Sequence, residues 1–450
     1  MSATPSPTIL LPQLPPKTLV GIDLITFTST PNFHGVRDLP AGWHFLYTGT
    51  TETFSLRSGS WFHISADHPS VPDVLIWKWN PDTETLEPLR ASSPADTQEA
   101  MRHKANLGAV WQAGGLFRYR SRVPPSGASG DTAIVRTGTT VDHDEATEAE
   151  GRQDWQGLTD RLSPALLTRV VGAAEVDVDG RPRWMVTSAS SAERDNDAIP
   201  GLPDVQASAE MARVTGAPES EFSFLPVDLK RTWREGAIGR ERTEAAQDRS
   251  WALGEVVRRA AEAAPGGEDG GEAQVLGELQ FTFLMVLTLM NYSCLQQWKR
   301  LLELVLTCQS AIRDRTAFMS AVVRLLLLQL QRCDDVEGGL FDLDGEDGGA
   351  FLRKLLVKFR RSLYVVEGAG EAVKHEFVKL EAWVREEYDW ELDREAVVRR
   401  GMVQLEDGEQ VELQMDEDDD DEYAPVVVDL GDSMEVSQDE EEGEIDDPRM

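Results

Sequence analysis

The stretch Val275-Leu-Gly-Glu-Leu-Gln-Phe-Thr-Phe-Leu-Met-Val-Leu-Thr-Leu289 is apolar on almost every side of a helical wheel. A helix of this kind is expected to be buried on all sides. Amphipathic segments flank it, beginning at Trp251 and covering 295–310 and 317–330, with apolar residues at three- and four-residue steps. This pattern predicts roughly five to seven helices over residues 242–400, packed as a bundle or superhelix around 275–289.

The N-terminal part has a different pattern, with short segments dense in β-branched and aromatic residues. These segments cover 18–22, 43–47, 54–56, 61–64, 74–79 and 85–89. Such runs between turn signals are typical of strands. In one of them Trp43, Phe45 and Tyr47 alternate with other residues and should share one face of a sheet. We predict an antiparallel β-sandwich-like domain over residues 17–150.

The middle of the chain, residues 151–241, is predicted to hold one helix followed by a flexible linker. Apolar residues recur with helical spacing over 154–171, whereas 186–220 lose this periodicity and fill with Ser, Ala, Asp, Pro and Gly. The predicted fold class is therefore α+β and multidomain. A helical domain over 242–400 follows the linker, and an acidic disordered tail over 401–450 ends the chain.

Negative charge is concentrated in that tail. The 450 residues carry a formal net charge of −35, and residues 405–450 contain 21 acidic residues against the single base Arg449. A charge run such as Asp416–Glu422 is normally disordered. Because no basic stripe accompanies this charge, we expect no direct binding to nucleic acid.

The sequence also lacks recognisable membrane, export and disulfide signals. The longest apolar run, 281–290, is about half of what a bilayer-spanning helix needs. The Pro-rich start has no basic flank of the kind that precedes a signal peptide. The three cysteines lie in apolar helical sequence, which predicts buried, reduced thiols. We therefore expect a soluble, intracellular protein without contact to a membrane.

Catalytic and metal-binding patterns are nearly missing. Four histidines cluster in the β region: His34, His44, His63 and His68. Their spacings fit no recognised ligand pattern. We therefore predict no enzyme activity, no catalytic residue, no metal and no cofactor. A hydrolase or metalloenzyme that uses His44 and His63 is the rival hypothesis.

One short segment inside the acidic tail is rich in β-forming residues: Tyr423-Ala-Pro-Val-Val-Val-Asp-Leu430. An apolar β-segment embedded in a solvated tail is a frequent means of adding a strand to a partner's sheet. Pairing with the β domain of this same chain is the alternative interpretation.

Seven motifs together, in this order, resemble one family. They are Gly21-Ile-Asp23, Phe33-His-Gly-Val36, Leu39-Pro-Ala-Gly-Trp-His-Phe45, Leu276-Gly-Glu-Leu-Gln-Phe281, Gln297-Trp-Lys-Arg-Leu-Leu302, Tyr388-Asp-Trp390 and Ala424-Pro-Val-Val-Val-Asp-Leu430. The set is similar to the Aar-two family of splicing factors, which assist the assembly of the U5 small nuclear ribonucleoprotein (U5 snRNP). The resemblance spans both halves of the chain and reaches into the tail.

This resemblance implies an N-terminal β-sandwich-like domain, a linker and a C-terminal helical domain of VHS-like character. It implies a non-enzymatic factor in cytoplasm and nucleus that binds the RNase H-like and Jab/MPN domains of the Prp-eight scaffold. Binding within a U5 snRNP precursor would block premature entry of RNA and of the helicase. The added strand falls on seven residues: Ala424, Pro425, Val426, Val427, Val428, Asp429 and Leu430.

An acidic-tailed chaperone of histones or ribosomal proteins is the alternative function, and it would depend on Asp416–Glu422 rather than on the valines.

The sequence also predicts the roles of several single residues. Asp23 is predicted either to face a partner at the surface or to cap a turn. Gly21 and Gly42 are predicted to serve tight turns. Three aromatic residues of the helical half are predicted to be core: Phe281, Phe283 and Trp298.

Overall fold

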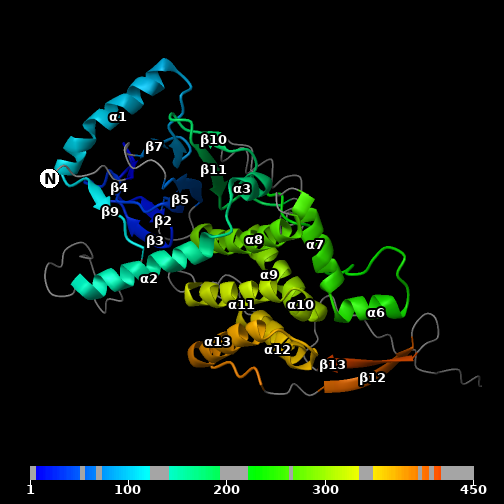
Figure 1. Ribbon diagram of the computed structural model, residues 1–450. Coiled ribbons are helices and arrows are strands. Elements are labelled where there is room, and N and C mark those ends of the chain that lie inside the picture. The colour runs from blue at the N-terminus through cyan, green and yellow to red at the C-terminus, as the bar shows by residue number, and fades with distance from the viewer. Residues whose placement is uncertain are drawn as a thin grey trace, which may run out of the picture. The chain divides into compact units, whose positions relative to one another are not determined.

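The computed structural model describes residues 7–50, 56–66, 73–121, 141–192, 221–262, 267–333, 348–393, 398–404 and 410–416. Residues Met1–Arg394 form one compact unit, and the residues from Glu395 onward form a second. Within the first unit, a β-rich half precedes a helical half, which confirms the predicted α+β fold class (Figure 1).

Two sheets make up the β-rich half. A five-stranded sheet has the order β8-β7-β1-β4-β9 and contains β1 (Thr8–Leu10), β4 (Gly35–Arg37), β7 (Val74–Asn80), β8 (Thr85–Pro88) and β9 (Leu116–Arg118). A six-stranded sheet has the order β10-β11-β6-β5-β2-β3 and contains β2 (Leu19–Ile22), β3 (Ile25–Thr28), β5 (Gly42–Gly49), β6 (Arg57–Ile64), β10 (Glu175–Val176) and β11 (Pro182–Thr187).

The predicted antiparallel pairing holds throughout the six-stranded sheet only. In the five-stranded sheet, β1 pairs in parallel with β7, and β4 pairs in parallel with β9. Parallel neighbours must be joined by long connections rather than by hairpins. Residue alternation marks a strand but not its partner, so the sequence pattern did not indicate these two pairs.

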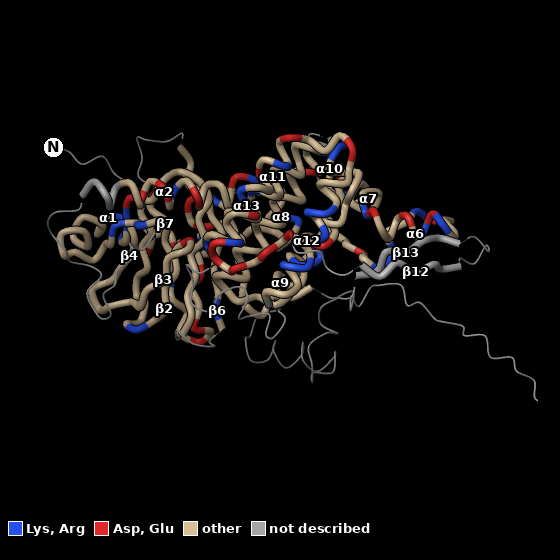
Figure 2. Tube along the Cα trace, turned by 90° about the horizontal axis from the view of Figure 1, so that it is seen from below, with Lys and Arg blue, Asp and Glu red and all other residues tan. Residues whose placement is uncertain are grey.

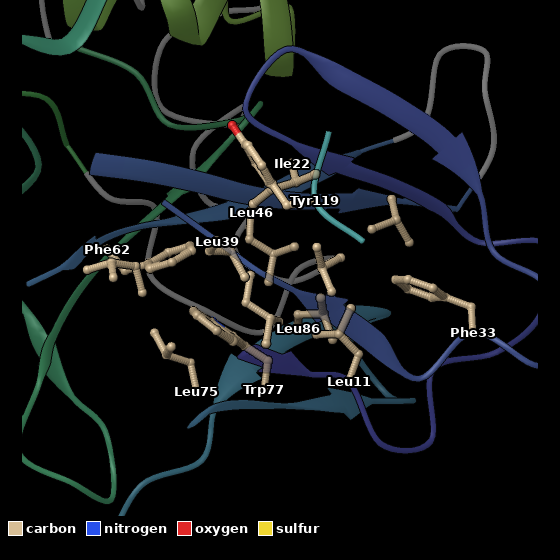
Figure 3. Close-up of a cluster of buried hydrophobic side chains, with 14 of the residues drawn as sticks. Leu11, Ile22, Phe33, Leu39, Leu46, Phe62, Leu75, Trp77, Leu86 and Tyr119 are labelled. Atoms are coloured by element: carbon tan, nitrogen blue, oxygen red, sulfur yellow. The ribbon is translucent and has the colours of Figure 1, made fainter. Parts of the chain in front are cut away.

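The two sheets pack face to face over the main core of this half (Figure 3). Leu46 and Phe62 come from the six-stranded sheet, and Leu75 and Trp77 come from the five-stranded sheet. The opposite face of the six-stranded sheet packs on helices, where the ring of Trp61 stacks with Trp155 at 6.1 Å. The six-stranded sheet is therefore buried on both faces, which explains why almost every residue of its central strands β5 and β6 is buried.

Helix α1 (Pro94–Gln112) covers the outer face of the five-stranded sheet (Figure 1). Ser93 caps its first turn, because Ser93 Oγ accepts a hydrogen bond from Asp96 N at 3.3 Å, and Pro94 occupies the first helical position. The pattern of the sequence did not indicate this helix. Ala100 is its one buried residue, so an apolar stripe with helical spacing is missing.

Eleven helices are described, and α1 is followed by ten more. They are α2 (Val141–Thr159), α3 (Pro164–Val171), α6 (Arg240–Gln247), α7 (Ser250–Glu262), α8 (Gly267–Leu289), α9 (Tyr292–Leu306), α10 (Gln309–Asp314), α11 (Thr316–Gln331), α12 (Gly348–Val365) and α13 (Glu371–Tyr388). Helix α8 packs against α2, α3, α7, α9, α11 and β6. Every residue of 274–289 is buried, so the predicted central helix is confirmed, and Phe281, Phe283 and Trp298 lie in the core as predicted.

The middle segment contributes structure to both halves. β10 and β11 complete the six-stranded sheet, with β11 antiparallel to β6. Residues 221–239 contain no helix or extended strand, yet Phe222, Leu225 and Val227 are buried. Residues 193–220, where the loss of periodicity predicted a linker, lie outside the described residues. The division of the chain at residues 150 and 241 stays a prediction.

In the second unit, β12 (Val398–Gln404) and β13 (Gln410–Asp416) form an antiparallel hairpin. The acidic composition predicted a disordered tail over residues 401–450; β12 and β13 are the described part of that region, and the division of the chain at residue 401 stays a prediction. Val411, Leu413 and Met415 alternate with polar residues in the sequence, a period-two pattern typical of a strand. The high acidic content of the surrounding residues obscured it.

Two helical glycines allow a matched test of packing around α8. A Cβ added at Gly277 would lie 2.5 Å from Leu166 Cδ1 and 2.7 Å from Arg161 O, whereas a Cβ at Gly254 meets nothing within 4 Å. We expect Gly277→Ala to lower the free energy of unfolding by about 1–3 kcal/mol. Gly254→Ala should raise it by about 1 kcal/mol, since Ala favours a helix. Urea unfolding followed by circular dichroism measures both, and equal effects would contradict the close packing at Gly277.

Candidate functional site

The partner-binding segment predicted from the sequence, Ala424–Leu430, lies outside the described residues, and so does His68. Three features of the first unit combine polar groups with unusual environments. These are a buried cluster around His44, an aromatic groove beside Trp43, and a set of buried polar side chains on α8.

The first feature is a cluster of buried polar side chains inside the sandwich. Asp23 is 2% exposed and occupies the β2–β3 turn with a φ of 57°. Its Oδ1 accepts a hydrogen bond from Phe45 N at 2.9 Å, and its Oδ2 accepts one from Tyr119 Oη at 2.6 Å. His44 Nδ1 lies 2.8 Å from the same Oδ2, and His44 Nε2 lies 2.9 Å from Pro40 O. The surface role considered for Asp23 is therefore wrong, because its carboxylate ties three elements together internally.

The charge state of this cluster follows from its partners. Both ring nitrogens of His44 face acceptors, the Asp23 carboxylate and the Pro40 carbonyl, so an imidazolium that donates from both nitrogens fits the site. Burial lowers the pKa of His44, but the Asp23 charge and the two hydrogen bonds outweigh it and raise the pKa above its ordinary value. His44 in this state is a structural ion-pair member and offers no lone pair to a metal or a substrate.

His34 and His63, the other described histidines of this region, do not form a catalytic group with His44. His34 Nδ1 lies 3.0 Å from the backbone oxygen of its neighbour Phe33, and His63 packs edge-on against Trp43 at 5.1 Å. Within the part of the chain that the structure describes, no three His, Cys, Asp or Glu side chains are placed to hold a metal ion. The described helices likewise include none that is long and apolar enough to cross a membrane.

The glycine expected to form a tight turn next to Asp23 has another role. Gly21 lies within β2, opposite Tyr47 of β5. A Cβ at Gly21 would lie 2.0 Å from the Tyr47 ring, so the glycine provides space for the aromatic side chain and not a turn. Gly42 has a φ of 130° where β5 begins, a backbone conformation that favours glycine.

The second feature is a groove of about 330 Å³ between the six-stranded sheet and α3. Eight residues line it: Trp43, His63, Leu162, Ser163, Pro164, Arg181, Pro182 and Trp184. The Trp43 and Trp184 rings are 5.7 Å apart, and their indole N–H groups donate to Leu162 O and Thr168 Oγ1 at 3.1 Å. Since both donors are already used, these indoles contribute apolar ring surface to the groove.

The third feature is a carboxylate buried inside the helical half. Glu278 of α8 is 0% exposed. Arg169 Nη1 of α3 lies 2.7 Å from Glu278 Oε2, and Gln297 Nε2 of α9 donates to Oε1 at 2.7 Å. Leu225 N donates to Oε1 at 3.0 Å, while Leu225 O accepts from Gln297 Nε2 at 3.0 Å. The side chains of Glu278 and Gln297 therefore bond the backbone N–H and C=O groups of Leu225. Neighbouring strands would bond these groups in a sheet, but Leu225 is not part of a strand.

Two further side chains attach α8 to the β-rich half. Gln280 Nε2 donates to Gly157 O at 2.9 Å, and Gln280 Oε1 accepts from Arg161 N at 2.9 Å, which fixes the turn between α2 and α3. Asn291, directly after α8, donates to Ser190 O at 2.7 Å and accepts from Cys294 N at 2.9 Å, so it also caps α9. The Leu276–Phe281 motif therefore has a structural role in joining elements. The sequence signal for it was a Glu and a Gln inside an otherwise apolar helix.

Both halves of the chain are similar to known proteins. A family model described as "AAR2 N-terminal domain" matches residues 5–172, and one described as "AAR2 C-terminal repeat region" matches residues 224–393. The chain is 25% identical over 393 residues to "Protein AAR2 homolog" of Mus musculus, covering 86% of this chain and 90% of that protein. The homologue of Homo sapiens gives 25% over 394 residues with the same coverage. That of Caenorhabditis elegans gives 21% over 391 residues, 83% of this chain and 91% of that protein. The resemblance seen in the motifs is confirmed.

The buried carboxylate gives a stability prediction. Glu278→Ala leaves the Arg169 guanidinium and Leu225 N without their acceptor, so we expect the free energy of unfolding to fall by about 3–5 kcal/mol. Glu244→Ala is the control, because the Arg240–Glu244 pair is exposed, with both side chains 62% accessible, and should cost below about 1 kcal/mol. Chemical denaturation of the three proteins measures the difference. Similar losses in both variants would contradict the role of the Glu278 contacts.

The His44 ion pair gives a pH prediction. Because the folded state raises the pKa of His44 above 6.5, its contribution is full below that pH and is lost as pH rises through the raised value. Between about pH 6 and pH 9, the unfolding free energy of the wild type should therefore fall more than that of His44→Gln. The pKa of His63 is lowered by its burial and by the His44 charge, so His63→Gln should retain the wild-type fall. Urea unfolding at each pH tests this, and an equal fall in His44→Gln would contradict it.

Proposed function

The chain belongs to the AAR2 family of splicing-related factors, and from this we propose that it is a non-enzymatic factor acting in U5 snRNP assembly. Family membership over both halves of the chain carries this proposal. The matched regions, 5–172 and 224–393, cover most of the β-rich half and the helical half of one compact unit. A protein without a catalytic role can act by holding a partner and by covering its surfaces.

We propose the Prp-eight scaffold as that partner, bound through its RNase H-like and Jab/MPN domains. The segment Ala424–Leu430 would add as a strand to a sheet edge, where backbone hydrogen bonds supply affinity. In a strand, Val426 and Val428 would point to one face and Val427 to the other. Such a strand would keep the two partner domains together and so delay entry of RNA and of the helicase.

The acidic residues around this strand support a second element of the proposal. Asp416–Glu422 precedes the strand, and further acidic residues follow Leu430. Acidic side chains beside a docked strand can cover a basic RNA-binding surface of the partner, an effect that weakens as salt rises. The role requires the protein to meet an assembling particle, so we place it in both cytoplasm and nucleus.

A non-enzymatic role agrees with the chemistry of the described side chains. His44, the most buried imidazole, is bonded at both nitrogens, and Glu278 is bonded to α3, α9 and residue 225. The alternative, an acidic-tailed chaperone of histones or ribosomal proteins, rests on the charge of the tail. It differs from the first proposal in requiring the acidic block and not the valines.

A pull-down with the purified RNase H-like and Jab/MPN domains tests the proposal. Val426→Asp/Val428→Asp should reduce the joint complex at least about tenfold, because two charged side chains would face an apolar sheet surface. Met434→Asp/Val436→Asp is the matched control, since it adds the same charge at the same spacing outside the strand. It should bind like the wild type, and circular dichroism should show the fold intact in both.

The same assay separates the two functions. The acidic residues of Asp416–Glu422 can be replaced by the corresponding amides. If the chain binds the Prp-eight domains by strand addition, this variant should still form the joint complex at moderate salt. If the chain is a histone chaperone, the variant should lose its binding to free histones. Wild-type protein that captures neither Prp-eight domain, even at low salt, would refute the proposed partner.

A further inference from the structure

The groove beside Trp43 has room for a further chain segment. Its volume of about 330 Å³ lies in the range of ligand pockets, whose walls are mainly apolar and aromatic. Five of its lining residues form such walls: Trp43, Leu162, Pro164, Pro182 and Trp184. Figure 1 shows α3 lying beside β11, the two elements that carry part of this lining. Because both indole N–H groups already donate within the fold, an occupant meets ring surface.

The charges of the groove are neutralised within the fold. Arg181 Nε donates to Asp177 Oδ2 at 3.0 Å and Arg181 Nη1 donates to Asp73 Oδ1 at 3.2 Å. Its Nη2 donates to Asp179 Oδ2 at 2.6 Å. Burial and a nearby positive charge lower the pKa of His63, so its imidazole is neutral at pH 7. Among the described residues that line the groove none is acidic. Charge complementarity therefore favours an uncharged occupant.

The chain contains a segment of matching chemistry ahead of β1. Residues 1–7, Met-Ser-Ala-Thr-Pro-Ser-Pro, have no charged side chain, and the first charged side chain of the sequence is that of Lys17. Beyond this point, basic and acidic positions recur along both halves of the described chain (Figure 2). Prolines favour the extended polyproline II conformation. Aromatic grooves bind such segments because little conformational entropy is lost when they dock.

The first described residues lie next to one end of the groove. Thr8 N donates to Asp73 O at 2.8 Å. The side chain of the same Asp73 accepts the hydrogen bond from Arg181 of the groove lining. One residue therefore links the start of β1 to the groove.

A second contact connects the same point of the chain to Trp43. Leu39 N donates to Pro7 O at 3.2 Å, and Leu39 precedes Trp43 by four positions in the sequence. Residues 1–6 can extend over about 20 Å. From their attachment at Pro7 they are therefore long enough to reach the Trp43 ring.

We propose that residues 1–6 of this chain occupy the groove, with Pro5 against the Trp43 and Trp184 rings. A tethered segment has a high effective concentration at a site beside its attachment point. A proline-rich segment of another protein must therefore displace it before entering the groove. The inference concerns the β-rich half and does not rest on the function proposed for the tail.

Paramagnetic broadening in the full-length protein tests this contact. A nitroxide is attached to Ser2→Cys, and incorporated 5-fluorotryptophan gives one fluorine signal per Trp, assigned by replacing each Trp with Phe in turn. The native cysteines are buried and do not compete for the label: Cys294, Cys308 and Cys333. We expect the Trp43 and Trp184 signals to broaden at least about threefold more than that of Trp251, which is 43% exposed on α7 of the helical half.

Two variants of the segment test whether the proline is recognised. Pro5→Ala removes the ring that packs on the indoles and should lower the broadening of the Trp43 signal at least about twofold. Thr4→Ala is the matched control, because it changes the adjacent residue and keeps both prolines, and it should leave the broadening unchanged. An excess of the unlabelled peptide Ser-Ala-Thr-Pro-Ser-Pro should reduce the broadening by competition. Val426→Asp/Val428→Asp should behave like the wild type, so failure of the proposed tail function remains distinguishable.

Three results would overturn the inference. The first is that the label broadens the Trp43 signal no more than the Trp251 signal. The second is that Thr4→Ala lowers the broadening as much as Pro5→Ala, which would show that the proline is not recognised. The third is that the added peptide shifts the Trp43 signal although the label does not broaden it, which would assign the groove to a segment of another protein.

Discussion

The carboxylate of Glu278 lies fully inside the helical half, and this one buried charge constrains how the surrounding elements can be arranged. Removing a carboxylate from water costs several kcal/mol unless close partners compensate. Three groups do so from three separate places: Arg169 of α3, the backbone of Leu225, and Gln297 of α9. None of the three can move far without leaving the charge unpaired. The native packing of α8 and the native position of the segment around Leu225 therefore depend on each other.

The same helix also connects the β-rich and helical halves. Gln280 holds the turn between α2 and α3, and Asn291 holds the end of β11. Arg57 of β6 donates to Thr288 O at 2.9 Å, which satisfies a carbonyl in the last turn of α8. Polar side chains in an apolar environment act here as geometric constraints, because each has a limited set of acceptable partners. This explains how Met1–Arg394 behaves as one compact unit although its two halves have different secondary structure.

The periodicity of apolar residues was sufficient to predict the elements that are buried on one face or on all sides. The alternation of 43–47 correctly predicted a strand with different faces, and the continuous apolar run 275–289 correctly predicted a central helix. Features that depend on contacts between residues far apart in the sequence could not be predicted from periodicity. The parallel pair β1–β7, helix α1 with one buried residue, and the burial of Asp23 all depend on neighbours distant in sequence. The same holds for the site around Glu278. The sequence motif that contains Glu278 was recognised by its resemblance to a family. Its contacts with Arg169, Leu225 and Gln297 could be found only in the structure.

The use of polar groups inside the fold limits where a partner can bind. His44, Asp23, Glu278, Gln280 and Asn291 are all satisfied by internal contacts, so none is available for chemistry or for recognition without disruption of the fold. Recognition must then use side chains that packing does not require. On α12 the leucines form the buried face of the helix, and Arg360 adds an ion pair with Glu381 of α13. A fold held together by such internal polar contacts leaves recognition to the side chains on its outer surface.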